Sequence, residues 1–226
     1  MKGKKTEFMI DFNRLKKRKQ YELHQIFADL YEGLFHYIET EANLREKVRA
    51  KEIYRYKTGL KKDQMMTKEE EVQFEHWFAF DHITVIGSRM FDLFVRERQG
   101  EMSQRMLEMA GILMLMHLQP YRVLNVEEDG ITAVPLYQPD RREILIPFMS
   151  HPLPEESDLI MARTMKIGFE KKLIGPAFSI DSKWENYVTE RLAAAHEQGQ
   201  LAYRKYLKEY GIDFRKYRRT SLDDST

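Results

Sequence analysis

Apolar side chains between residues 23 and 38 recur at steps of one and three along the sequence. The stripe consists of Leu23, Ile26, Phe27, Leu30, Tyr31, Leu34, Phe35 and Ile38. A helix places residues with this spacing on one face, so the pattern predicts a helix from about residue 12 into the forties. Residues 43–66 are highly charged, and Gly59 followed by Lys61-Lys62-Asp63 indicates a connection.

A second helix is predicted to begin at Thr67-Lys68-Glu69-Glu70, which fits a capping box. In this motif the threonine oxygen accepts a hydrogen bond from the amide of residue 70, and the Glu70 side chain reaches back to residue 67. Bulky aromatic residues follow and point to more than one side of this helix, which predicts that it is buried. They are Phe74, Trp77, Phe78 and Phe80.

A third helical segment is predicted after Ser103, which is a favourable residue for a helix N-cap. Residues 106–116 are apolar nearly all round a helix, as is typical of a helix at the centre of a bundle. Pro120 is expected to end this helix.

Downstream of residue 121 the pattern changes to β-prone runs separated by turns. Residues 122–126 and 131–137 flank the hairpin signal Asp129-Gly130, and further strands are predicted at 143–148, 159–167 and 172–174. Five short antiparallel strands in so few residues indicate a small barrel or a curled sheet.

The C-terminal part is predicted to be a helix. Ser182-Lys183-Trp184-Glu185 fits a second capping box, Gly199 can split the helix, and the tail beyond Gly211 is expected to fray. The sequence therefore predicts an α+β fold with three parts. These are a helical region over 1–118, a small antiparallel β unit over 119–181, and a C-terminal helix with a basic tail over 182–226.

Composition narrows the class of protein. Hydrophobic residues make up 42% and charged residues 32%, as in soluble globular proteins. Cysteine is absent, which excludes disulfides, thiolate zinc sites and cysteine nucleophiles. The longest apolar run, from Met109 to Leu118, is shorter than the roughly 20 residues of a membrane span, and no apolar signal core follows the basic N-terminus. We therefore expect a cytoplasmic protein that does not enter a membrane.

Positive charge is concentrated at the two ends of the chain. The net charge is only +1, yet residues 1–20 carry eight Lys and Arg against two acidic residues, and residues 201–219 carry seven against two. Two interpretations stay open: the ends are simply solvated, or they bind an anionic partner.

Aromatic residues alternate with cations in the C-terminal segment, a composition that suits stacking on unpaired bases and tracking of phosphates. The alternatives are that the tyrosines pack on the body while the basic residues stay in water, or that the segment docks onto an acidic protein groove. The residues predicted to contact nucleic acid are Lys16, Lys17, Arg18, Lys19, Tyr203, Arg204, Tyr206, Lys208, Tyr210, Arg215 and Arg218.

Chemistry-bearing side chains give weaker signals. Glu32 and His36 could share a helix face, but both fall on its polar side. His76 and His82 project about 120° apart on a helix, so with Asp81 they would not chelate one ion. The sequence contains no G-x-S-x-G, P-loop, G-x-G-x-x-G or H-E-x-x-H motif. No cofactor or metal is therefore predicted.

The aromatic segment F-x-x-W-F-x-F-D, here Phe74 to Asp81, stands upstream of the helix at Ser103 and of the β run Tyr121–Gly130. Together with Met161-Ala162-Arg163 in a later strand, these features resemble a module of uncharacterised bacterial proteins, some of which also carry a SEC-C zinc motif. SEC-C needs cysteines that this chain lacks, so the resemblance implies a fold and no zinc site.

The leading hypothesis is a non-catalytic cytoplasmic binding protein that contacts a protein or nucleic-acid partner through its basic ends. One alternative is a metal-dependent enzyme using His76, Asp81 or His82. Another is a self-associating protein whose Met-rich helix, residues 106–116, is buried by a second copy.

Overall fold

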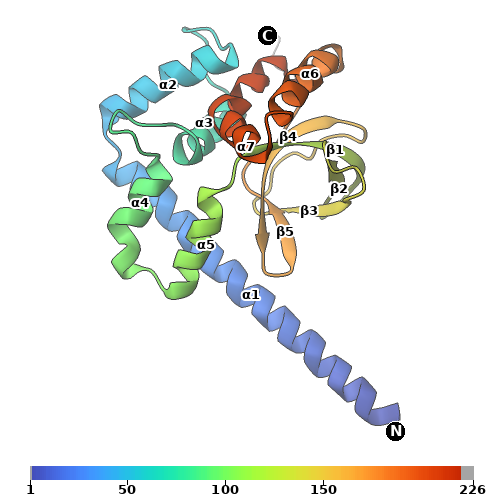
Figure 1. Ribbon diagram of the computed structural model, residues 1–226. Coiled ribbons are helices and arrows are strands. Elements are labelled where there is room, and N and C mark those ends of the chain that lie inside the picture. Colours follow the sequence, from blue (N-terminus) through green and yellow to red (C-terminus); the bar gives the residue numbers. More distant parts are fainter. Residues whose placement is uncertain (1, 220–226) are drawn as a thin grey trace.

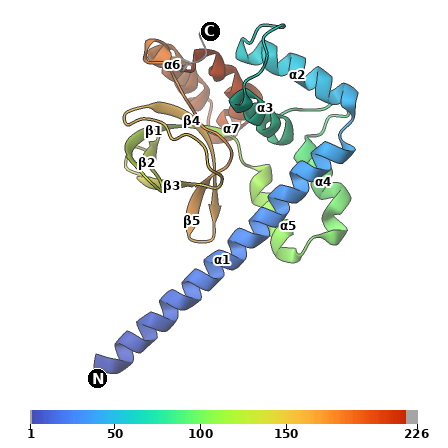
Figure 2. The same cartoon turned by 180° about the vertical axis from the view of Figure 1, so that it is seen from behind.

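The longest element is the helix α1, Lys2–Glu41. The computed structural model describes residues 2–219, with side chains from residue 11 onward. Figures 1 and 2 show that the C-terminal half of α1 packs against the body while its N-terminal half projects away from it. The predicted stripe is confirmed, since Phe27, Leu30 and Leu34 are fully buried. The helix starts about ten residues earlier than predicted.

The highly charged stretch after α1 forms a helix that the apolar pattern did not predict, α2, Leu44–Thr58. Asn43 accepts a hydrogen bond from the amide of Arg45 at 2.9 Å, and Gly59 ends the helix in a left-handed conformation with φ 74°. Only one narrow face of α2, with Ala50 and Tyr54, is buried. Charged residues cover the rest, which explains why the stretch read as a connection.

The aromatic segment lies on α3, Lys68–Phe80, and is buried as predicted. Thr67 Oγ1 accepts a hydrogen bond from the amide of Glu70 at 3.2 Å, so half of the predicted capping box is present. The other half is wrong: the Glu70 carboxylate binds Arg215 and does not reach back to residue 67.

Two further helices complete the helical region: α4, Met90–Arg98, and α5, Gln104–Met114, with the short 3₁₀ helix η1, Gln99–Glu101, between them. Ser103 caps α5 as predicted, accepting from the amide of Met106 at 3.3 Å. The expectation of all-round burial is wrong, because Ile112 and Leu115 remain about half exposed. Pro120 also does not end this helix; α5 stops at Met114 and Pro120 lies inside the first strand.

Six strands form one curled sheet. They are β1 (Leu118–Glu127), β2 (Gly130–Pro135), β3 (Glu143–Pro147), β4 (Leu159–Ile167), β5 (Glu170–Leu173) and β6 (Phe178–Ser179). The strand order is β1-β2-β3-β5-β4-β6, and β1 also pairs with β4, so the pairings return to the first strand. The hairpin at Asp129-Gly130 is confirmed. The expectation of purely antiparallel pairing is wrong, because β3 runs parallel to β5.

The C-terminal part consists of η2 (Ser182–Trp184), α6 (Glu185–His196), α7 (Gln200–Tyr210) and the 3₁₀ helix η3 (Gly211–Tyr217). The split at Gly199 is confirmed. The capping box predicted at Ser182 is wrong. Asp181 accepts a hydrogen bond from the amide of Lys183 and so caps η2, the turn that leads into α6. The fraying prediction is also wrong up to residue 219, because Ile212 and Phe214 are buried; the rest of the tail lies outside the described residues.

One large hydrophobic cluster joins α1, α3, α4 and α5 to one face of the sheet and to the C-terminal helices. A smaller cluster fills the interior of the curled sheet around Tyr121, Leu145 and Ile160. The large cluster crosses both predicted segment boundaries, because Leu159 and Val188 belong to it together with Phe27. Among the described residues, no helix combines the length and apolar character that crossing a membrane requires.

Candidate nucleic-acid interface

Arg215, a predicted nucleic-acid contact near the C-terminus, is buried inside the protein. Its side chain is 1% exposed and donates from Nη2 to Glu70 Oε1 at 2.8 Å and to Glu69 Oε1 at 2.8 Å. Arg218 lies beside it, with Nη2 3.0 Å from Glu70 Oε1. Both guanidinium groups therefore neutralise a carboxylate of this chain.

The pKa values around this ion pair follow from the contacts. Burial alone would raise the pKa of Glu70, but the hydrogen bonds and charge of Arg215 hold it below its usual value. Tyr54 donates a further hydrogen bond to Glu70 Oε2 at 2.9 Å. Glu70 therefore stays ionised at neutral pH and ties η3 to α3.

The predicted tyrosines of α7 are largely packed against the protein. The Tyr203 ring lies edge-on to Tyr137, with centroids 5.7 Å apart, and Tyr206 packs on Tyr210 at 5.3 Å. Tyr203, Tyr206 and Tyr137 are half-buried, and Tyr210 is 42% exposed. The C-terminal segment therefore agrees better with the interpretation in which its tyrosine rings pack on the body of the protein than with one in which they stack on bases.

The two predicted cations of α7, Arg204 and Lys208, are also constrained, whereas Lys205 is exposed. Lys208 donates to the backbone oxygen of Met114, and burial, followed by the charge of Arg89, lowers the pKa of Lys208 to about 8. Arg204 is half-buried. Neither side chain stands in open solvent, as a phosphate contact would require.

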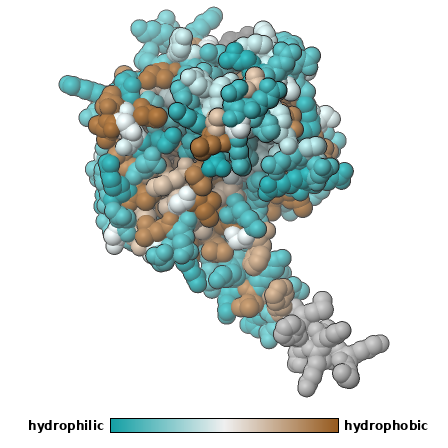
Figure 3. Space-filling view, in the orientation of Figure 1, coloured by the Kyte–Doolittle hydropathy of each residue, from teal (hydrophilic) through white to brown (hydrophobic). Residues whose placement is uncertain are grey.

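The predicted cations of α1 have the opposite environment. Lys16, Lys17, Arg18 and Lys19 are all exposed. Arg18 Nε lies 3.9 Å from Glu22 Oε1, whereas the three lysines have no carboxylate partner among the described residues. Figure 3 shows that this part of α1 leaves the body with hydrophilic and apolar side chains interspersed, and Phe12 and Leu15 are 59% and 54% exposed.

The turn between β4 and β5 docks beside this basic stretch. Gln20 Nε2 donates to the oxygen of Ile167 at 3.1 Å, and the amide of Phe169 donates to Gln20 Oε1 at 2.8 Å. Gly168 has φ 62°, and a Cβ there would lie 2.5 Å from Gln20 Oε1. Glycine therefore lets the turn approach α1 closely and fixes where Phe169 stands.

A groove of about 610 Å³ separates the turn from α1, and we name it the α1–turn groove. Its lining residues are Asn13, Lys16, Lys17, Gln20, Tyr21, His24, Phe169 and Glu170. Two aromatic rings stay open to solvent, Tyr21 at 66% and Phe169 at 54% exposure. Lys16 Nζ lies 5.0 Å from the centre of the Phe169 ring. The groove combines two lysines with two exposed rings.

The acidic side chains nearest the groove have partners already. Glu170 Oε2 lies 2.8 Å from Lys172 Nζ, and Glu22 Oε2 lies 3.6 Å from Arg105 Nη1. Lys16 and Lys17 are therefore available to an external anion. Neither Tyr21 nor Phe169 was selected from the sequence. The sequence signal for Phe169 was its position directly after Gly168 in a turn between two strands, where a phenylalanine is exposed.

His76, Asp81 and His82 do not form a common site. His76 Nδ1 donates to the oxygen of Val72 at 2.7 Å, which leaves Nε2 to accept from the Tyr31 hydroxyl at 2.6 Å. Burial lowers the pKa of His76 to about 3, so this ring stays neutral. Asp81 pairs with the buried Arg163.

Two further histidines have partners within the protein, whereas Nε2 of His151 is buried without a hydrogen-bond partner among the described residues. His82 Nε2 lies 2.8 Å from Glu46 Oε1, and His117 Nδ1 bonds the oxygen of Leu115 at 2.9 Å, as expected for a core residue. Glu32 and His36 are exposed on α1. In the part of the chain that the structure describes, no group of three or more His, Cys, Asp or Glu side chains could hold a metal ion.

Comparison of the chain with protein-family models, with curated proteins and with solved structures gives no match.

Proposed function

We propose that this protein is a non-catalytic nucleic-acid-binding protein that holds single strands in the α1–turn groove. The observation that carries the proposal is the pairing of exposed cations with exposed rings. Lys16 and Lys17 stand on one wall, and Phe169 and Tyr21 are open to solvent beside them. We expect the cytoplasm as its location, because a cysteine-free chain suits a reducing compartment.

The groove suits a single strand better than a duplex. Lysines of α1 can follow the phosphates, and each exposed ring offers a face for an unpaired base, a contact worth roughly 1–3 kcal/mol. Bases stacked inside a duplex cannot reach such a ring. The curled sheet adds an analogy only: small closed β units recur among oligonucleotide binders.

The proposed interface leaves out the residues of the C-terminal segment that the sequence predicted as contacts. Arg215 and Arg218 neutralise Glu70, so we leave them out of the interface. Tyr203, Tyr206 and Lys208 are engaged in packing or hydrogen bonding, and Arg204 and Tyr210 lie on the same segment. We keep Lys16, Lys17, Arg18 and Lys19 and add the two rings.

The proposal is tested by fluorescence anisotropy with labelled single-stranded RNA and DNA and with a duplex of the same length, at two salt concentrations. We expect single strands to bind more tightly than the duplex. Salt should weaken the binding, because each neutralised phosphate of a single strand contributes about 0.7 to the slope of log K against log salt. Binding that is absent, or that does not respond to salt, contradicts the proposal.

A further inference from the structure

One face of α1 presents exposed polar and charged side chains from Arg14 to Glu39. Its residues are spaced by three or four, so they form one stripe on a helix of 3.6 residues per turn. They are Arg14, Lys17, Tyr21, Gln25, Ala28, Glu32, His36 and Glu39. All of these are exposed except the half-buried Ala28. The stripe is basic in its N-terminal half and acidic in its C-terminal half.

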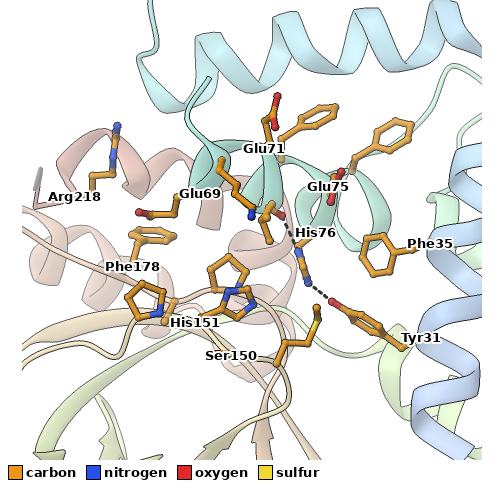
Figure 4. Close-up of a pocket in the computed structure, with 18 of the residues that line it drawn as sticks. Tyr31, Phe35, Glu69, Glu71, Glu75, His76, Ser150, His151, Phe178 and Arg218 are labelled. Atoms are coloured by element: carbon orange, nitrogen blue, oxygen red, sulfur yellow. Dashed lines mark hydrogen bonds between the residues drawn. The ribbon is translucent and has the colours of Figure 1, made fainter. Parts of the chain in front are cut away.

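The acidic half of the stripe borders a cleft of about 1470 Å³, and both α1 and α3 contribute residues to its walls (Figure 4). Glu71 and Glu75 of α3 face the cleft opposite Glu32 and Glu39 of α1. These four carboxylates have no hydrogen-bond or ion-pair partner among the described residues. Burial, followed by the charge of Glu71, raises the pKa of Glu75. The charge of Glu39 acts in the same direction, and that of Lys51 acts against it. The four carboxylates stand near one another in the cleft, which favours a cationic occupant.

The cations at the cleft have other contacts. Lys47 donates to the backbone oxygen of Glu39 at 3.1 Å, and Lys51 Nζ lies 5.6 Å from the centre of the Phe74 ring. Arg218 pairs with Glu70, Arg219 pairs with Glu155 and Asp158, and Lys68 stands at the outer end of the cleft on α3. None of them forms an ion pair with the four carboxylates.

The cleft also offers aromatic surface beside the carboxylates. The Phe35 ring lies 4.7 Å from Tyr31 and 5.3 Å from His76, measured between centroids. Figure 4 shows Phe35 and Tyr31 projecting from α1 toward His76 of α3, with the hydrogen bond from Tyr31 to His76 drawn. Such rings receive the aliphatic stem or the charge of a lysine or arginine.

The matching cation lies on the same helix of another molecule. The steps of three and four from Arg14 to Lys17 to Tyr21 equal those from Glu39 to His36 to Glu32. When two α1 helices pair antiparallel, Arg14 therefore stands opposite Glu39, Lys17 opposite His36 and Tyr21 opposite Glu32, twice over, and Arg14 with Glu39 is the pair of opposite charge. A two-fold interface of this kind is self-complementary, since each half of the stripe meets the other half.

We infer that two copies of this protein associate through antiparallel pairing of their α1 helices, with the basic stretch of each seated at the acidic cleft of the other. The association also supports the projecting half of α1. A helical segment as short as this half of α1 has marginal stability in water when nothing packs against it. Residues 11–19 are all exposed here.

The paired state is compatible with the α1–turn groove in part. Lys16 and Phe169 lie off the stripe and stay accessible, whereas Lys17 and Tyr21 are shared by both contacts. A second copy and a single strand therefore compete for these two side chains. The inference itself does not depend on nucleic-acid binding, because it is argued from the charges of α1 and of the α3 wall of the cleft.

Sedimentation velocity of the nuclease-treated full chain over a concentration series tests the inference with two charge-reversed variants. One carries Arg14→Glu and Lys17→Glu, and the other carries Glu32→Lys and Glu39→Lys. We expect the wild type to form dimers that salt weakens. Each variant alone should associate on the order of tenfold or more weakly, because residues 14 and 39 then carry the same charge and face each other. An equal mixture of the two should form a heterodimer.

Lys205→Glu with Lys216→Glu is the matched control, since both residues are exposed on the C-terminal segment away from α1, and it should dimerise like the wild type. If a reversed variant misfolds by circular dichroism, the neutral pair Glu32→Gln and Glu39→Gln replaces it and should also weaken the dimer. A wild type that stays monomeric, or a mixture that fails to pair, overturns the inference. Nucleic-acid binding that persists in the Glu32→Lys, Glu39→Lys variant shows that the groove is independent of this outcome.

Discussion

The two basic ends of this chain look alike in sequence and have opposite environments in the structure. The C-terminal segment folds back as η3, where Arg215 is 1% exposed and Ile212 and Phe214 join the core. The N-terminal stretch of α1 leaves the body, and residues 11–19 are exposed without exception. Clustered lysines and arginines therefore indicate an interface only where the fold leaves them without an internal counter-charge.

The difference arises from what each segment meets. Glu70 lies at the start of α3 with its carboxylate buried, and such a group requires a cation nearby. Arg215 supplies it, and the aromatic residues around it provide apolar surface to bury. Among the described residues, the basic stretch of α1 contacts the β4–β5 turn through two hydrogen bonds of Gln20 and through Lys16 Nζ above the Phe169 ring. Its lysines stay in water.

The largest expected effect comes from removing the buried cation. Arg215→Met should lower the free energy of unfolding by up to about 3–5 kcal/mol, because Glu70 loses its buried partner and keeps the less buried Arg218 and the Tyr54 hydroxyl as its contacts. Urea denaturation followed by circular dichroism measures the change. The exposed neighbour is the control: Lys216→Met should stay within about 0.5 kcal/mol. Equal costs for the two variants would contradict the contrast between a structural and a solvated cation.

Acid should weaken the same contact, to a smaller extent than removing Arg215. The pKa of Glu70 is lower in the folded than in the unfolded protein, so its stabilisation is present above the unfolded value of about 4.3. It is lost as the pH falls through the folded value. The gap in unfolding free energy between the wild type and Glu70→Gln should therefore narrow from pH 7 toward the acid limb. A gap that stays constant would show that ionisation of Glu70 does not contribute.

At the other end, removal of a ring should affect binding and leave folding alone. Phe169→Ala is expected to weaken single-strand binding by roughly 1–3 kcal/mol, because a stacking face is lost from the groove. Tyr210→Ala removes an exposed ring of the C-terminal segment and should leave the affinity unchanged. Anisotropy titrations of both variants, with thermal melts as a check on folding, decide the matter. A larger loss for Tyr210→Ala would move the interface to the C-terminus.

The smallest expected effect concerns the start of the C-terminal part. Asp181 accepts a hydrogen bond from the amide of Lys183, so Asp181→Ala should lower the melting temperature slightly. Ser182, which the sequence pattern selected as a cap, makes no such bond, and Ser182→Ala should be nearly neutral. The two melting curves are compared side by side. A larger loss of stability for Ser182→Ala than for Asp181→Ala would support the capping box that the sequence predicted.

Local patterns predicted the α+β class and much of the helical region. The stripe from Leu23 to Ile38, the caps at Thr67 and Ser103, and the hairpin at Asp129-Gly130 each depend on residues close in sequence. The parallel pairing of β3 with β5 joins segments over twenty residues apart, and no local signal encodes it. The helix α2 escaped because its buried face is too narrow to stand out among its charges.

The sequence predicted the lysines of the candidate site but not its aromatic rings. The α1 lysines were selected from composition, and the structure leaves them exposed. Phe169 could not be placed beside them, because that contact depends on Gln20 holding the turn nearly 150 residues away. The burial of Arg215 equally depends on Glu70, 145 residues upstream. Which cations are internal and which are free is a tertiary property that composition does not contain.

The most direct test of the account compares matched lysine pairs from the two ends. Lys16→Ala with Lys17→Ala and, as its counterpart, Lys205→Ala with Lys216→Ala are titrated with the same single-stranded oligonucleotide at two salt concentrations. We predict that the α1 pair weakens binding and lowers the salt slope by about 0.7 for each lysine that contacts a phosphate, whereas the C-terminal pair binds like the wild type. Equal losses, or a loss confined to the C-terminal pair, would contradict the account.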